Sequence, residues 1–205
     1  MLPTTTTLHQ NEIPGEPRCA VVHHYSLGAV AEMEVDFRAA LPPELPSAVG
    51  VSIGLASADA LIQTLALATR DTVFCLRLQQ PPSATQSKTL QKIFSNIQYL
   101  AGFELPYTLI FLAHTLGSKV SGYDLSTLPI NSKDGGITIP GKFFLSKGHH
   151  ALDRRINERW DGDIQRSDPK STGTPDPDHA LRAWYTAMCV CDTHPCISLS
   201  LYPLL

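Results

Sequence analysis

The chain of 205 residues lacks an excess of basic charge and lacks any long run of apolar residues. Its net charge of −3 at pH 7 argues against tight, sequence-independent binding of nucleic acid over the whole surface, because such binding depends on counterion release by many basic side chains. No apolar segment is long enough to cross a bilayer, and the first residues lack the apolar core of a secretory signal. We therefore expect an intracellular protein of the nucleus or cytoplasm with no membrane partner.

Three signatures of catalytic and nucleotide-binding sites are also missing. The sequence has no G-x-S-x-G nucleophile elbow, no G-x-x-x-x-G-K-[ST] phosphate loop and no G-x-G-x-x-G that follows a strand pattern. Internal repeats are not evident either. Serine-hydrolase chemistry and phosphate binding of these common kinds therefore have no basis in the sequence.

What the chain does contain fits one globular domain with irregular ends. Hydrophobic residues make up 43% of the sequence, which is ordinary for a globular protein. Residues 1–17 hold threonines and prolines without an apolar period, and we expect them to form a disordered lead. We expect a single α/β domain over residues 18–189 with an exposed loop at 166–179, and an irregular tail at 190–205 that indicates a truncated or mispredicted C-terminus.

Apolar periodicity predicts an alternation of strands and helices. Two apolar runs, residues 61–69 and 72–78, are separated by Arg70-Asp71 and indicate a β-hairpin. Further strands are predicted at 49–54 and 99–103, and helices at 28–41, 87–96, 105–116 and 180–189. The residues expected to face the core are Val30, Met33 and Phe37 in the first helix and Leu90, Ile93 and Phe94 in the second. This order of elements is typical of an α/β fold.

Four segments carry a resemblance to a known family. They are Val49-Gly50-Val51-Ser52-Ile53-Gly54, the hairpin, Ala101-Gly102-Phe103-Glu104-Leu105-Pro106-Tyr107-Thr108-Leu109, and Tyr185-Thr186-Ala187-Met188-Cys189. Over residues 30–190 the chain resembles the DEDD-type 3′–5′ exonuclease branch of the ribonuclease-H-like superfamily, and in particular degenerate fungal proteins of this type. The resemblance implies an α/β fold with a ribonuclease-H-like mixed sheet, in which antiparallel hairpin strands join parallel strands and helices flank the sheet.

The resemblance also gives the positions of four acidic metal ligands, and none of these positions is acidic here. The family motifs read V-G-V-D-x-E, V-G-H-N-x-x-x-D-L and Y-x-x-x-D, so the matching residues are Ser52, Gly54, Thr108 and Cys189. The family reaction uses two divalent ions about 4 Å apart, and such ions need carboxylate ligands. The resemblance thus implies a catalytically inactive exonuclease-like domain with no catalytic residue, bound metal or other cofactor.

One alternative is an active enzyme in which the carboxylates have shifted. Glu104, Asp124 and Asp163 are the fallback metal ligands. A 3′–5′ exonuclease or phosphodiesterase of this kind would use Mg²⁺ or Mn²⁺. The alternative requires the three carboxylates to lie within a few ångströms of one another.

The candidate partners are single-stranded nucleic acid and another protein. Lys142, Lys147 and Arg154, with Phe143 and Trp160 near them in sequence, are the candidate residues for nucleic-acid binding, since basic side chains contact phosphates and aromatic rings stack on bases. In the competing interpretation the aromatic residues are core and the charges face water. A third hypothesis is a protein-interaction scaffold without a ligand, which the near-neutral charge favours.

Overall fold

The structure, a computed structural model, describes both the central part of the chain and short segments nearer its ends. The described residues are 3–8, 19–41, 48–55, 62–78, 81–102, 105–117, 120–125, 176–191 and 201–202. None of the helices in these segments combines the length and the apolar character that a membrane crossing requires.

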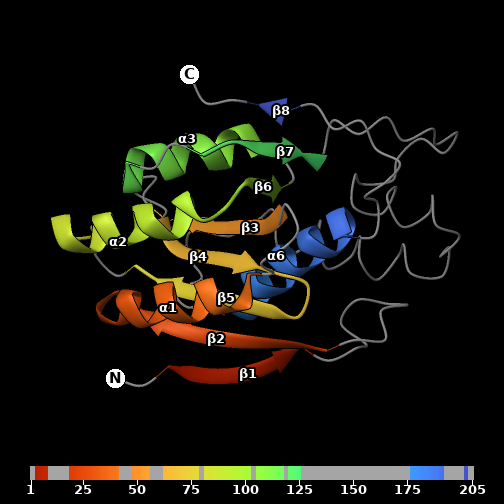
Figure 1. Cartoon of the computed structure of the whole chain (residues 1–205), viewed down its shortest axis with the longest axis horizontal. Helices are drawn as coiled ribbons and strands as arrows, with labels where there is room; N and C mark the ends of the chain where they lie inside the picture. Colours follow the sequence, from red (N-terminus) through yellow and green to blue (C-terminus); the bar gives the residue numbers. More distant parts are fainter. Residues whose placement is uncertain are drawn as a thin grey trace, which may run out of the picture.

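A mixed sheet runs through the centre of the structure (Figure 1). Its strands are β1 (Thr4–Leu8), β2 (Ala20–Ser26), β3 (Ala48–Leu55), β4 (Ile62–Ala68), β5 (Thr72–Arg77), β6 (Tyr99–Gly102), β7 (Gly122–Asp124) and β8 (Leu201–Tyr202). The order is β1-β2-β5-β4-β3-β6-β7-β8. The pairs β2–β5, β3–β6 and β6–β7 are parallel and the others are antiparallel. The predicted hairpin is β4–β5, and the mixed sheet confirms the expected fold class.

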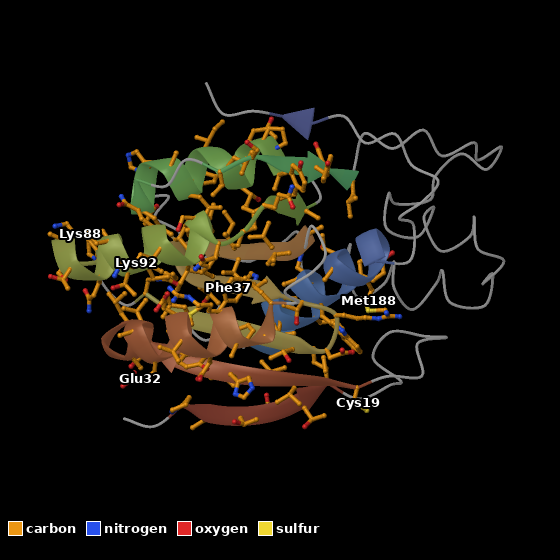
Figure 2. All side chains as sticks on the ribbon, viewed as in Figure 1. Cys19, Glu32, Phe37, Lys88, Lys92 and Met188 are labelled. Atoms are coloured by element: carbon orange, nitrogen blue, oxygen red, sulfur yellow. The ribbon has the colours of Figure 1, made fainter. Side chains whose placement is uncertain are left out.

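Helices cover both faces of this sheet. A 3₁₀ turn, η1 (Leu27–Ala29), leads into α1 (Val30–Ala40), and the further helices are α2 (Ala84–Ser95), α3 (Leu105–Leu116) and α6 (Asp176–Cys191). Helices α1, α2 and α3 share one apolar core with the sheet, and α6 shares a second core with the opposite face. The six residues predicted to face the core from α1 and α2 are all buried. Figure 2 shows Phe37 between α1 and α2, and it shows Lys88 and Lys92 on α2, where both are exposed.

Local hydrogen bonds define the limits of α2 and α3. Helix α2 begins at Ala84, earlier than the predicted start at residue 87, because Ser83 forms a capping box. The Ser83 hydroxyl accepts a hydrogen bond from the Gln86 N–H at 3.3 Å, and the Gln86 side chain accepts one from the Ser83 N–H at 2.8 Å. Helix α3 ends as predicted before Gly117, whose φ of 64° suits glycine and whose N–H donates to the Ala113 carbonyl at 3.0 Å.

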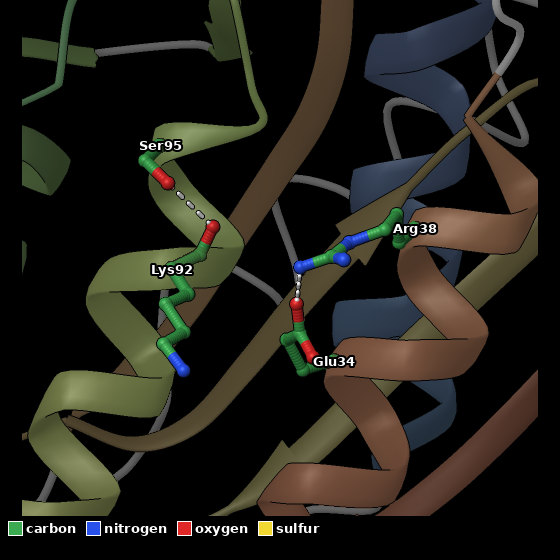
Figure 3. A network of polar contacts seen from close by, with 4 residues as sticks. All are labelled: Glu34, Arg38, Lys92 and Ser95. Atoms are coloured by element: carbon green, nitrogen blue, oxygen red, sulfur yellow. Dashed lines mark hydrogen bonds and ion pairs between the residues drawn. The ribbon is translucent and has the colours of Figure 1, made fainter.

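A buried phenol ties α1 to the sheet. Tyr25 of β2 donates a hydrogen bond to Asp36 Oδ2 at 2.7 Å, and burial, followed by this hydrogen bond, raises the pKa of the Tyr25 phenol. On the side of α1 that faces α2, Arg38 pairs with Glu34 one turn earlier (Figure 3). Exposed ion pairs contribute less than about 1 kcal/mol. The attachment of α1 therefore depends on its buried residues and on the Tyr25–Asp36 contact.

The first part of the chain differs from the prediction. Thr4–Leu8, expected within a disordered lead at residues 1–17, form β1, and Ala20–Ser26 form β2 ahead of the predicted first strand. Threonine and valine are β-branched and favour strands, and pairing within a sheet stabilises such short runs even where no apolar period marks them. Residues 9–18 lie outside the described residues.

The last part of the chain differs in a similar way. Helix α6 begins at Asp176, inside the expected loop at 166–179, and continues to Cys191, beyond the expected end at 189. Leu201–Tyr202, expected within the irregular tail at 190–205, form β8 against β7. The prolines and aspartates that suggest a loop are also common in the first turn of a helix, so composition alone does not locate the boundary.

Small residues line the face of the sheet beneath α6, so this helix lies very close to the strands. The buried small residues are Ala66, Ala68 and Ala101. A Cβ atom at Gly50 of β3 would collide with the Ala183 carbonyl oxygen and lie 2.6 Å from the Ala187 nitrogen. Only glycine therefore fits at position 50 while α6 keeps its place.

Trp184 fixes the same helix at a second point. Its side chain is fully buried, and its Nε1–H donates to the Arg70 carbonyl at 2.8 Å. Arg70 lies in the turn between β4 and β5, so α6 is held both along β3 and at the end of the hairpin.

Replacing Gly50 by alanine should destabilise the fold by about 1–3 kcal/mol or more, because the added methyl group meets helix backbone that cannot yield without moving α6. Urea unfolding followed by tryptophan fluorescence measures the loss. The matched control is Gly28→Ala in η1, where a Cβ meets only Ser26 Oγ at 3.8 Å and the change in unfolding free energy should stay within about 0.5 kcal/mol. Equal effects of the two substitutions would contradict the close approach of α6 to β3.

Candidate functional site at the carboxyl end of β3

The site is built where the last residues of β3 meet the first turns of α6. Residues two apart on a strand point to the same face, so Gly50, Ser52 and Gly54 all face α6. In open α/β sheets ligands bind beyond the carboxyl ends of the parallel strands. Ser52 and Gly54 lie toward that end of β3, which makes this the natural place to look for function.

A hydrogen bond between β3 and α6 occupies the site. Ser52 Oγ lies 3.1 Å from Nδ1 of His179, and the two side chains are only 6% and 9% exposed. The two residues are far apart in sequence, so the contact forms only when α6 docks on the sheet. A buried hydroxyl or imidazole costs free energy unless it has a hydrogen-bond partner, and here the two groups are partners of each other.

The same imidazole fills the space beside Gly54. A Cβ atom at Gly54 would lie 2.6 Å from Nε2 of His179 and 3.2 Å from its Cδ2 and Cε1 atoms. The hydrogen bond to Ser52 restrains the ring, so it cannot swing away without losing that partner. A side chain at position 54 would therefore force the His179 imidazole out of its present position.

The fold is similar to that of solved exonuclease structures, although the sequence has no detectable relatives in two other comparisons. No protein-family model matches the sequence, and no curated protein sequence matches it. Two solved structures are similar: RNase D of Trypanosoma brucei, solved as a GMP complex, with a TM-score of 0.54, and the EXO domain of Nibbler from Aedes aegypti, with a TM-score of 0.51. The chain has the fold of ribonuclease-H-like 3′–5′ exonuclease domains.

The similarity to these two structures is high in coverage of this chain and low in sequence identity. Sequence identity is 14% to the trypanosomal RNase D and 12% to the Nibbler domain, so the likeness concerns the fold alone. The alignments cover 85% and 84% of this chain. They cover 57% of the RNase D chain and 90% of the Nibbler domain, so this chain corresponds to about half of the former and to most of the latter.

Of the four positions matched to exonuclease acids, the structure brings together Ser52 and Gly54 but not Cys189. Cys189 lies ten residues after His179 on the same helix, and a rise of 1.5 Å per residue puts its backbone about 15 Å farther along α6. The α6 residue that meets Ser52 and Gly54 is His179. The sequence interpretation missed it because it placed residue 179 at the end of a loop, whereas Asp176-Pro177-Asp178 before it is a typical first turn of a helix.

Thr108 lies in the first turn of α3, which follows the carboxyl end of β6. Its side chain is half-buried. Helix α3 packs through Leu105 and Leu109 into the core shared with α1 and α2, so Thr108 belongs to the layer opposite α6. It stands at the same edge of the sheet as Gly54 without sharing a face with it.

Asp124, a fallback ligand, faces away from Ser52. It pairs in register with Gly102, and a Cβ at Gly102 would meet Leu105 and Val51 in the core beneath α1, α2 and α3. Asp124 is 6% exposed on that same face, whereas Ser52 points toward α6. The sheet therefore separates Asp124 from the Ser52–His179 contact.

The remaining predicted residues fall outside the described part of the chain. They are the fallback ligands Glu104 and Asp163 and the basic residues Lys142, Lys147 and Arg154. Within the described residues, no three side chains of histidine, cysteine, aspartate or glutamate lie together in a group that could hold a metal ion.

The Ser52–His179 contact should be measurable as a coupling free energy. Ser52→Ala should lower the free energy of unfolding by about 1–3 kcal/mol, because it removes a partner from a buried imidazole nitrogen. In a double-mutant cycle with His179→Ala, the double variant should lose about 1 kcal/mol less unfolding free energy than the sum of the two single losses. Ser95→Ala, which removes an exposed hydroxyl bound to the Lys92 carbonyl, is the control and should cost less than about 0.5 kcal/mol. Strict additivity of Ser52→Ala and His179→Ala would contradict the hydrogen bond.

Proposed function

We propose that this chain is a 3′–5′ exonuclease-like domain that no longer hydrolyses nucleic acid. The observation that carries the proposal is the buried imidazole of His179, which is hydrogen-bonded to Ser52 and fills the space beside Gly54. Ser52 and Gly54 match the first two acids of the exonuclease motif. The place of two carboxylates is thus taken by a hydroxyl, a hydrogen atom and an imidazole that contact one another.

The chemistry of these groups does not fit a two-ion centre. Two divalent cations need several anionic oxygen ligands to offset their charge, and Mg²⁺ in particular favours carboxylates and water. Ser52 and Gly54 contribute no negative charge. Nδ1 of His179 already has a partner, and its Nε2 faces the Gly54 backbone at a distance that leaves no room for an added side chain.

The alternative of an active enzyme with shifted carboxylates has less support. It needs Glu104, Asp124 and Asp163 around common ions, and Asp124 lies on the face of the sheet opposite Ser52. A centre built around Asp124 would have to form on the side covered by α3, beneath a core of leucines.

We further propose that the domain still binds single-stranded nucleic acid, through Lys142, Lys147 and Arg154. Three basic residues within a short stretch supply a local positive charge that the net charge of −3 does not reveal. The trypanosomal RNase D with a similar fold was solved in complex with GMP, a nucleotide. The competing proposal, a protein-interaction scaffold without a ligand, predicts no such affinity.

Incubation of the full chain with a labelled single-stranded oligonucleotide and Mg²⁺ or Mn²⁺ should give no degradation above the buffer blank, because the carboxylates that hold the ions are replaced. An active RNase D assayed in parallel shows that the conditions support hydrolysis. Metal-dependent degradation that disappears in Glu104→Ala would overturn the proposal and favour the enzyme with shifted carboxylates.

A binding titration in EDTA tests the second part separately. The triple variant Lys142→Ala, Lys147→Ala and Arg154→Ala should bind the oligonucleotide at least about tenfold more weakly than the native chain, with a shallower salt dependence, because fewer phosphates are neutralised. The charge-matched control replaces the exposed basic residues Arg38, Lys88 and Lys92 of α1 and α2 by alanine and should leave the affinity unchanged. Equal affinity of the first variant and the native chain would remove these residues from the interface, and no binding at all would favour the scaffold.

A further inference from the structure

Among the residues that the structure describes, β1 is paired on one side only, so its outer side forms an edge of the described sheet. β1 is the first strand in the sheet order, and Figure 1 shows it as the outermost strand beside β2. On an edge strand, alternate residues direct their N–H and C=O groups away from the sheet, where they bond to water or to another strand. β1 pairs with β2 without a break from Thr4 opposite His24 to Leu8 opposite Ala20. The edge is therefore regular over its whole length.

This edge lacks the features that normally prevent strand pairing. Natural edge strands are protected by charged side chains, by proline within the strand or by a β-bulge. β1 is a run of four exposed threonines followed by the buried Leu8, and its pairing with β2 shows no shift in register. The sequence up to residue 11 contains no lysine, arginine, aspartate or glutamate. Threonine is also among the residues that favour strands.

We propose that β1 pairs with β1 of a second copy of this chain, in an antiparallel two-fold dimer. Antiparallel pairing of a strand with itself satisfies the outward N–H and C=O groups of both copies by the same contacts, as a two-fold axis requires. Four identical residues in succession place threonine opposite threonine. Cross-strand threonine pairs are favourable, by about 0.2–1 kcal/mol each.

Charge favours a second copy over a foreign strand as the occupant. A strand that carries lysine or glutamate finds no opposite charge along β1, whereas β1 of a second copy brings no charge to the edge. Thr5 and Thr7 pair with His23 and Val21 of β2, and all four residues lie on the face of the sheet on which α1 packs. Val21 is 39% exposed on this face. A two-fold axis through the edge places the threonines of β1 beside those of the second copy.

The dimer is expected to be weak. Pairing over a five-residue strand buries less than the roughly 1,000 Å² that a stable interface needs, so association should depend on concentration and appear in the micromolar range or above. Other exposed apolar side chains among the described residues are Val35 on α1, at 62% exposure, and Tyr107 and Ile110 on α3, at 67% and 58%. Association through either helix would not depend on β1.

Sedimentation equilibrium of the full chain over a wide concentration range tests the proposal. The double variant Thr5→Lys and Thr7→Lys places like charges across the two-fold axis and should raise the dimer Kd at least about tenfold. The matched control, Thr85→Lys and Gln91→Lys, adds the same charge to exposed positions of α2 and should associate as the native chain does. A native chain that stays monomeric throughout would overturn the proposal. Equal association of the Thr5 and Thr7 variant would also overturn it and would point to another surface, such as that of α1 or α3.

Amide hydrogen exchange gives a second measurement on the native chain, and it applies even if the lysine variant fails to fold. Alternate amides of Thr4–Leu8 should gain protection as the protein concentration rises, because dimer formation gives them carbonyl partners. Amides of α2 should show no such dependence. Exchange in β1 that is independent of concentration, in a range where the protein is dimeric, would rule out this edge as the interface.

Discussion

The close contact between α6 and β3 is the constraint on which the rest of the structure depends. Gly50 has no Cβ atom, so the backbone of α6 lies directly on the strand at Ala183 and Ala187. His179, Ala183 and Ala187 are spaced by four residues and therefore form one stripe along the helix. Once Gly50 fixes Ala183 and Ala187, the helix geometry leaves His179 as the residue that meets the end of β3.

This contact also explains why the site is filled. The close approach of the helix leaves Ser52 and His179 only 6% and 9% exposed, so their polar groups need hydrogen-bond partners within the protein. The Ser52–His179 hydrogen bond meets this requirement with neutral groups. Glycine at position 54 leaves space for the imidazole, which occupies the volume that a side chain at this position would fill. The polar pair thereby becomes part of the core that holds α6 in place.

The two cores on either side of the sheet differ in character. The core beneath α1, α2 and α3 contains large side chains such as Phe37, Phe74 and Leu65. The core beneath α6 is rich in alanine, and its Trp184 is bonded to the turn of the hairpin at Arg70. Because Asp124 belongs to the first side and Ser52 and His179 belong to the second, the sheet itself keeps Asp124 apart from the other two residues.

Local sequence pattern was sufficient for much of the fold. The buried stripes of α1 and α2, the β4–β5 hairpin and the glycine that ends α3 follow from residue spacing and turn chemistry, which act over a few residues. Pattern was insufficient for β1 and β2, because a run of threonines has no apolar period and becomes a strand only when a neighbour supplies its hydrogen bonds. It was also insufficient for the start of α6, where proline and aspartate fit a turn and a helix equally well.

The sequence by itself predicted the fold class, and its resemblance to an exonuclease motif predicted that Ser52 and Gly54 stand at the positions of two acids. Only the tertiary structure decided which residue of the last helix stands beside them. The motif resemblance matched Cys189 to an acidic position of the last helix. The register of α6 on β3 is set by the contact of Gly50 with Ala183 and Ala187, and no local pattern encodes a contact between residues so far apart. That register brings His179 to Ser52, and it makes the site a packed hydrogen bond between strand and helix.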